Sequence, residues 1–204
     1  ASSEEELFND ENKKIIFNDF MYKKKMYGEK DELGNYIKGI EDYIPTSQYK
    51  TIEHKEKVIE DILNNWKILS RGNLFSAIFA TSSIPEAIEY YKMFKKKNSN
   101  IKITALFDPN IDNNDGFYIK EDGLVEVITD YNYTYGQNFS IPTYSRMKKD
   151  ISLRLAHKKP YNRITKNEQI DLLIVVDQML TGFDSKYINT LYLDKILKYE
   201  NIIQ

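Results

Sequence analysis

The 204-residue sequence contains no cysteine and only two histidines, His54 and His157. The absence of cysteine excludes disulfides, thiol nucleophiles, thiolate metal sites and iron–sulfur ligation. The two histidines lie far apart in the sequence, so no local histidine-based metal motif is present. The sequence therefore predicts no metal site of its own.

Long apolar runs and an excess of one charge are also absent. No segment approaches the roughly 20 apolar residues that a membrane span needs, and the acidic start does not resemble a secretory signal. We therefore expect no membrane association and a cytoplasmic location. The 29 basic and 31 acidic residues give a net charge of −2, so any contact with nucleic acid must be local.

Complete phosphate-binding and nuclease motifs are also missing from the sequence. No glycine is followed by Lys-Ser or Lys-Thr, so the sequence has no P-loop. No hydrophobic strand leads into Asp31-Glu32, so this pair of acids is not a convincing magnesium box. Glu53-x-Lys55 resembles half of a nuclease metal motif, but no Pro-Asp stands upstream of it. We expect the isolated chain to have no nuclease activity and little ATPase activity.

The composition is that of a folded protein, with 41% apolar and 29% charged residues. Residues 1–50 combine a charged start, an aromatic cluster and a lysine triplet, and they predict an N-terminal arm or irregular connector. Residues 51–204 predict one domain. Because the sequence begins with Ala1 and ends at Gln204, we expect a piece of a longer protein.

Hydrophobic periodicity predicts alternating helices and strands in this domain. Helices are expected at 54–70, from 84 onward, and from Ser140 to about His157, and a further helix is expected to start after 195. The residues rich in Asn, Asp and Gly at 108–140 predict a loop around a short strand near 125–128. Strands are expected at 74–80, 101–107, 171–176 and 190–194. This alternation is typical of a three-layer α/β domain with a mostly parallel sheet.

Ligands of such sheets bind at the carboxyl ends of the strands. After the first strand, Ser83 and Glu86 have the spacing of a capping box, with Pro85 in the first turn of the helix. After the strand 171–176, Thr181 supplies a hydroxyl and Gly182 allows a backbone to approach a phosphate closely. Asp184 is an acceptor suited to a ribose hydroxyl or an arginine. The same four residues, 181–184, are also compatible with a plain turn.

The residues around this turn resemble those of a known family. Leu180 to Asp184 read L-T-G-F-D, and Asn189 to Lys195 read N-T-L-Y-L-D-K. Both runs resemble motif V of superfamily-two helicases and, more closely, the motor part of the R subunit of type I restriction–modification enzymes. Residues 74–94 are similar to the motif IV region of that family. The resemblance covers about 54–204 and is strongest from 170 onward.

The resemblance implies that residues 51–204 form the second RecA-like motor domain of an R subunit, truncated before motif VI. Thr181 and Gly182 would contact the DNA backbone or couple it to the nucleotide. Asp184 would face the nucleotide or an arginine of motif VI. Ser82 and Ser83 would lie near DNA phosphates, although a capping role for Ser83 is equally compatible with the sequence.

The resemblance also implies the partners and cofactors of a parent enzyme. These are ATP and Mg²⁺, double-stranded DNA, a first RecA-like lobe and a nuclease domain of the same chain, and separate modification and specificity subunits. We expect no tightly bound cofactor on the piece itself. Two other interpretations stay open: a non-enzymatic α/β interaction module of a DNA-processing complex, and the second lobe of another superfamily-two helicase.

One segment is strongly basic, because residues 146–166 carry eight bases against the single acid Asp150. Such a segment predicts either a lining of a DNA path or a solvated helix face with a polar link. The eight bases are Arg146, Lys148, Lys149, Arg154, Lys158, Lys159, Arg163 and Lys166.

Overall fold

The structure, a computed structural model, describes residues 9–97, 100–108, 117–176 and 185–194. The chain divides into two compact units, Ala1–Lys55 and Glu56–Gln204. In the described residues, none of the helices has the length and apolar character that crossing a membrane demands.

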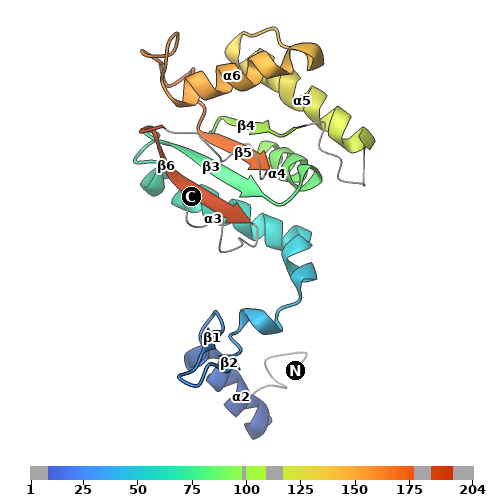
Figure 1. Ribbon diagram of the computed structural model, residues 1–204, viewed down its shortest axis with the longest axis vertical. Coiled ribbons are helices and arrows are strands. Elements are labelled where there is room, and N and C mark those ends of the chain that lie inside the picture. The colour runs from blue at the N-terminus through green and yellow to red at the C-terminus, as the bar shows by residue number, and fades with distance from the viewer. Residues whose placement is uncertain (1–8, 98–99, 109–116, 177–184, 195–204) are drawn as a thin grey trace. The chain divides into compact units, whose positions relative to one another are not determined.

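The second unit is built on a four-stranded parallel sheet with the order β4-β5-β3-β6. Figure 1 shows the sheet lying between α3 on one side and α5 and α6 on the other. This arrangement confirms the predicted three-layer α/β fold. The strands are β3 (Ser76–Thr81), β4 (Ile103–Leu106), β5 (Leu172–Val176) and β6 (Ile188–Asp194).

The two central strands consist almost entirely of buried apolar residues, whereas β6 alternates between half-buried and exposed positions. Continuous apolar runs form strands that are covered on both faces, and alternation is typical of a strand with one open face. Leu191 and Leu193 of β6 are accordingly exposed, and Tyr192 between them is half-buried. The hydrophobic pattern therefore places β3 and β5 at the centre of the sheet.

Helices α3 (Ile52–Leu69) and α4 (Ile84–Lys96) were both predicted from their periodicity. The ring of Phe79 in β3 packs edge-on against Tyr90 and Phe94 of α4, with centroids 4.8 and 6.4 Å away. Lys97 at the end of α4 forms an ion pair with Glu60 of α3. Helix α4 therefore covers the face of the sheet to which Phe79 points, and α3 is tied to it.

Helix α5 (Phe117–Tyr135) corrects the prediction of a loop and short strand at 108–140. The side chains of Leu124, Val127, Ile128 and Tyr131 are buried, and they recur at helical spacing. The asparagines, aspartates and glycines of this region obscured that spacing. Gly123 lies inside the helix because Ile88 of α4 occupies the space that a Cβ would need.

Helix α6 (Tyr144–Leu155) follows a single 3-10 turn at Ile141–Thr143, in agreement with the helix predicted from Ser140. The hydroxyl of Tyr144 donates to the carbonyl of Phe107, the residue that follows β4, at 2.9 Å. Met147, Ile151 and Leu155 are buried along one side of the helix. These contacts fix α6 beside the end of β4.

The first unit has more regular structure than the predicted irregular arm. Helix α2 (Glu11–Tyr22) begins at Asp10, whose carboxylate accepts from the backbone N–H groups of Asn12 and Lys13. Two short strands, β1 (Glu29–Lys30) and β2 (Tyr36–Ile37), then pair in antiparallel fashion. The 3-10 turns Glu41–Tyr43 and Thr46–Lys50 complete the unit.

Candidate nucleotide and nucleic-acid edge

The strands β3, β5 and β6 end together at one edge of the sheet. Thr81 is paired with Val176 on one side and with Asp194 on the other. The Thr81 side chain is buried, and its hydroxyl donates to the carbonyl of Val175 at 3.1 Å. This hydrogen bond ties the ends of the two central strands at the edge where ligands of parallel sheets bind.

Ser82 and Ser83 leave this edge and lead into α4. The Ser83 hydroxyl accepts from the backbone N–H of Glu86 at 3.4 Å, which confirms it as the N-cap of the helix. The Glu86 carboxylate accepts from both the backbone N–H and the hydroxyl of Ser82, at 2.8 and 2.6 Å. The capping carboxylate thus bonds one residue earlier than the capping-box spacing predicts.

This geometry separates the two serines chemically. Ser82 is exposed, and Ser83 is half-buried and occupied with the helix end. The hydroxyl of Ser82 faces the negative charge of Glu86, so a phosphate could approach it only if that carboxylate turned away. Of the two predicted DNA contacts, Ser82 is the more accessible.

The end of β6 is tied to α4 by a hydrogen bond from the Tyr90 hydroxyl to the Asp194 carboxylate. Burial, together with this bond, raises the pKa of Tyr90 far above its usual range, so the phenol stays protonated as a donor. Sequence reasoning missed this pair, because nothing local indicates a contact between residues so far apart. It fixes the carboxyl end of β6 relative to the helix that begins at Ser83.

The other predicted site residues, Thr181, Gly182 and Asp184, lie outside the described residues. They follow β5, whose last residue, Val176, is paired with Thr81. Ser82 directly follows Thr81 in the sequence, and Asp177 directly follows its strand partner Val176. Asp177 itself lies outside the described residues. The roles of Thr181, Gly182 and Asp184 stay predictions.

The basic segment 146–166 is divided between the interior and the surface. Arg154 is buried, and its guanidinium donates to the carbonyl of Glu168 and the hydroxyl of Tyr161, each at 2.9 Å. Lys148 is half-buried, with its ammonium group 5.2 Å from the centre of the Tyr144 ring. The remaining six bases are exposed: Arg146, Lys149, Lys158, Lys159, Arg163 and Lys166.

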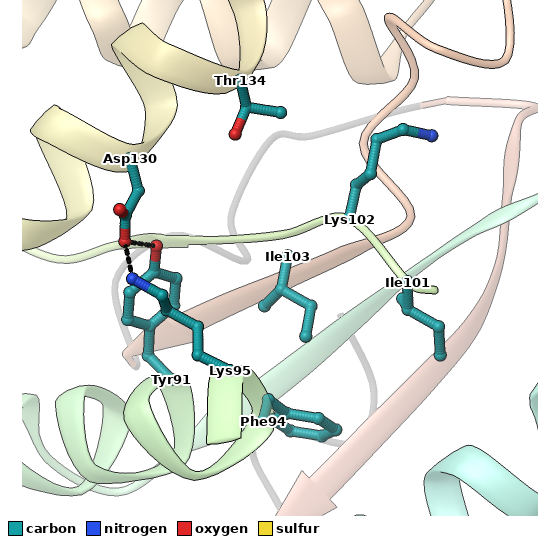
Figure 2. A pocket seen from close by; sticks show the side chains of 8 residues that line it. All are labelled: Tyr91, Phe94, Lys95, Ile101, Lys102, Ile103, Asp130 and Thr134. Carbon is teal, nitrogen blue, oxygen red and sulfur yellow. Dashed lines mark hydrogen bonds and ion pairs between the residues drawn. The ribbon is translucent and has the colours of Figure 1, made fainter. Parts of the chain in front are cut away.

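A pocket of about 280 Å³ lies at the opposite edge of the sheet, where Ile101 and Lys102 lead into β4. Figure 2 shows Asp130 of α5 held by Tyr91 and Lys95 of α4 at one side of this pocket. Lys102 donates to the carbonyl of Lys166. The charged groups of the pocket are thus already paired. Within the described ranges, His, Asp and Glu form no cluster suited to a metal ion.

Comparison with known proteins decides the family. Residues 73–204 match the family model described as type I restriction enzyme subunit R domain 3. The chain belongs to the type I restriction enzyme R-subunit family. The matched residues include the sheet, the carboxyl edge and both runs that carry the resemblance, L-T-G-F-D and N-T-L-Y-L-D-K. The resemblance noted in the sequence is therefore confirmed.

Individual R-subunit relatives agree with this assignment. The chain is 39% identical over 157 residues to the type I restriction enzyme SauCOLORF180P endonuclease subunit of Staphylococcus aureus (strain COL). It is also 39% identical over 158 residues to the SsaAORF53P endonuclease subunit of Staphylococcus saprophyticus. Each match covers 73% of this chain and 16% of the relative. The chain thus spans about one sixth of the length of the curated relatives it matches.

Proposed function

We propose that this chain is the second RecA-like lobe of an ATP-dependent DNA translocase, the R subunit of a type I restriction enzyme. The observation that carries the proposal is the sequence 180–195 in a chain of this family. It holds L-T-G-F-D, separated by three residues from the buried central strand β5, and N-T-L-Y-L-D-K in and after β6, the parallel strand that pairs with β3.

In the proposed mechanism, ATP with Mg²⁺ binds between this lobe and a first RecA-like lobe of the same polypeptide. Asp184 would face the nucleotide or an arginine that reaches it, and Thr181 and Gly182 would couple the state of the nucleotide to the DNA backbone. Ser82 adds a phosphate contact from the neighbouring strand end. Binding and release of nucleotide would open and close the cleft and move the lobe along DNA.

The fold supports this proposal in two ways. Parallel strands bring the residues after β3 and β5 to a common edge, so contacts to DNA and to nucleotide can share one rigid base. The links from Thr81 to Val175 and from Tyr90 to Asp194 tie β3, β5, β6 and α4 together at that edge. A change at the nucleotide would then displace the edge as a unit.

Phosphate contacts carry no sequence information, so target choice would come from separate modification and specificity subunits. The nuclease activity would come from another domain of the same polypeptide, since this chain lacks a complete nuclease motif. These partners belong to the proposal, as does double-stranded DNA as the substrate.

The proposal is tested by replacing Asp184 with alanine in the full-length subunit and measuring DNA-stimulated ATP hydrolysis. We expect turnover to fall at least tenfold, equivalent to about 1.4 kcal/mol of transition-state stabilisation, while the thermal unfolding temperature is unchanged. Glu121→Ala, which removes an exposed carboxylate on α5, is the matched control and should hydrolyse ATP normally.

Normal turnover in Asp184→Ala would remove this residue from the mechanism. If the full-length wild-type subunit also hydrolysed no ATP in the presence of DNA, the motor assignment would fail. A non-enzymatic α/β interaction module would then be the better description of this lobe.

A further inference from the structure

The exposed bases of residues 146–166 have no ion pair with a carboxylate among the described residues, as is also true of Lys67, Lys96 and Lys186, whereas several lysines of α3 and α4 are paired. Lys57 and Lys97 pair with Glu60, and Lys92 pairs with Glu126. In contrast, no ion pair joins any of the six exposed bases to a carboxylate in the described part of the chain. They are Arg146, Lys149, Lys158, Lys159, Arg163 and Lys166, here called the α6 basic surface. Its positive charge is therefore not neutralised locally.

The α6 basic surface is held in place from the inside. The Arg154 guanidinium lies between the rings of Tyr135 and Tyr161, 4.4 and 4.0 Å from their centroids. Its hydrogen bond to the Glu168 carbonyl fixes the far end of the segment. A surface ordered before binding loses less conformational entropy when a partner arrives.

A second attachment joins this segment to the residues before β6. The rings of His157 and Tyr187 are stacked with centroids 3.6 Å apart, and the Ser185 hydroxyl donates to the carbonyl of Leu155 at 2.9 Å. Tyr187 in turn accepts from the backbone N–H of Ser76, the first residue of β3. The middle of the segment, just after α6 ends, is thus fixed to the amino edge of the sheet.

The chemistry of the surface fits a polyanion better than a protein. Between Pro142 and Ile170, every residue of which is described, no large hydrophobic side chain is exposed. Protein interfaces have an apolar core of buried contacts, whereas phosphate contacts require only correctly placed charge. Arg146 and Lys149 are one helical turn apart on α6, which is about 18 Å long.

We propose that the α6 basic surface binds the phosphate backbone of double-stranded DNA as a contact separate from the Ser82 and Asp184 edge. The end of the segment lies toward the amino edge of the sheet, because the carbonyl of Lys166 accepts from Lys102, which precedes β4 and is bonded to Asp171 before β5. The motif residues instead follow the carboxyl ends. This inference rests on the proposed function and extends the DNA path to α6 and the residues that follow it; Figure 1 shows α6 on the outside of the sheet.

The test uses the full-length subunit with Lys158→Gln, Lys159→Gln and Arg163→Gln combined. Its affinity for a fluorescent duplex of arbitrary sequence is measured without ATP over a range of salt concentrations. The slope of log K against log salt is negative, and each lost phosphate contact reduces its magnitude by about 0.9, so the magnitude should decrease by up to about 2.7. Thermal unfolding should be unchanged, because all three side chains are exposed.

The matched control replaces the ion-paired Lys57, Lys92 and Lys97 with glutamine, which removes the same charge from α3 and from α4 and its C-cap. Its slope should equal that of the wild type. An unchanged slope in the first variant, or an equal decrease in both, overturns the proposed surface. So does loss of binding to another protein subunit without a change in the slope, which would assign the surface to an acidic protein.

The two proposals fail separately. If the first variant has a slope of smaller magnitude while Asp184→Ala hydrolyses ATP normally, the proposed DNA surface is supported and the proposed role of Asp184 is wrong. If the slope does not change while Asp184→Ala is inactive, the motor stands and this DNA contact falls.

Discussion

At the scale of single residues, the buried Arg154 organises the segment between α6 and β5. It donates to the carbonyl of Glu168 and to the hydroxyls of Tyr131 and Tyr161, and it lies 3.3 Å from the carboxylate of Asp150. Burial and the hydrogen bond to Asp150 raise the pKa of Tyr161 to about 12, so its hydroxyl remains a donor at neutral pH. The Arg154 guanidinium is therefore bound by partners inside the protein and belongs to the core, not to the surface.

We predict that Arg154→Met lowers the free energy of unfolding of the chain by about 3 kcal/mol, because Asp150 would remain without its cationic partner. The measurement is urea unfolding followed by circular dichroism. Arg146→Met on the exposed side of the same helix is the control and should change stability by less than about 0.5 kcal/mol. Equal midpoints for the two variants would show that the buried charge does not hold the segment.

At the scale of helices and strands, the contact between α4 and α5 depends on a glycine. A Cβ added at Gly123 would lie 2.5 to 2.9 Å from side-chain atoms of Ile88, closer than packed carbon atoms approach. In an open helix position, replacing glycine with alanine stabilises by roughly 1 kcal/mol. Here the overlap with Ile88 opposes that gain.

We therefore expect Gly123→Ala to destabilise the chain by about 1 to 3 kcal/mol. Shortening Ile88 to alanine removes the obstacle, so the double variant should lose less stability than the sum of the single losses. Thermal or urea unfolding of the four proteins measures this coupling. Additive losses would mean that α4 and α5 do not meet as closely at this point.

The strands and helices with strong patterns were predictable from the sequence alone. The run LLIVV of β5 is apolar throughout, and α4 has Ser83, Pro85 and Glu86 at its start. Helix α5 was not predicted, because the glycine that it needs for packing against Ile88 resembles a loop residue in the sequence. Gly123 is needed because α5 packs closely against Ile88 of α4, and a contact between two helices cannot be read from the local sequence.

The position of part of the candidate site was also predictable from the strand pattern. Parallel strands place the residues after β3 and β5 at one edge, so the position of Ser82 and Ser83 next to the end of β5 follows from the strand pattern, while their contact with DNA stays a prediction. The burial of Arg154 within a basic segment could not be predicted, because its partners Tyr131, Tyr135 and Glu168 come from other parts of the sequence. The charge pattern alone suggested a surface residue.

At the scale of the whole molecule, the second unit combines the sheet edge with an outer surface whose six exposed bases form no ion pair among the described residues. The edge offers contacts at the ends of β3 and β5, and the α6 basic surface would hold DNA further along the lobe. In the proposed translocase, one lobe would hold the DNA while the other lobe advances. A lobe with two separate DNA contacts is suited to that task, since one contact can hold while the other is released.

The measurement that tests the central claim most directly is translocation by the full-length subunit, assembled with its modification and specificity subunits. A labelled third strand is bound at increasing distances from a recognition site, and its displacement is followed after ATP is added. We predict that the lag before displacement grows linearly with distance in the wild type. In Asp184→Ala, the third strand should not be displaced. Displacement without ATP, or a lag independent of distance, would contradict a motor that steps along DNA.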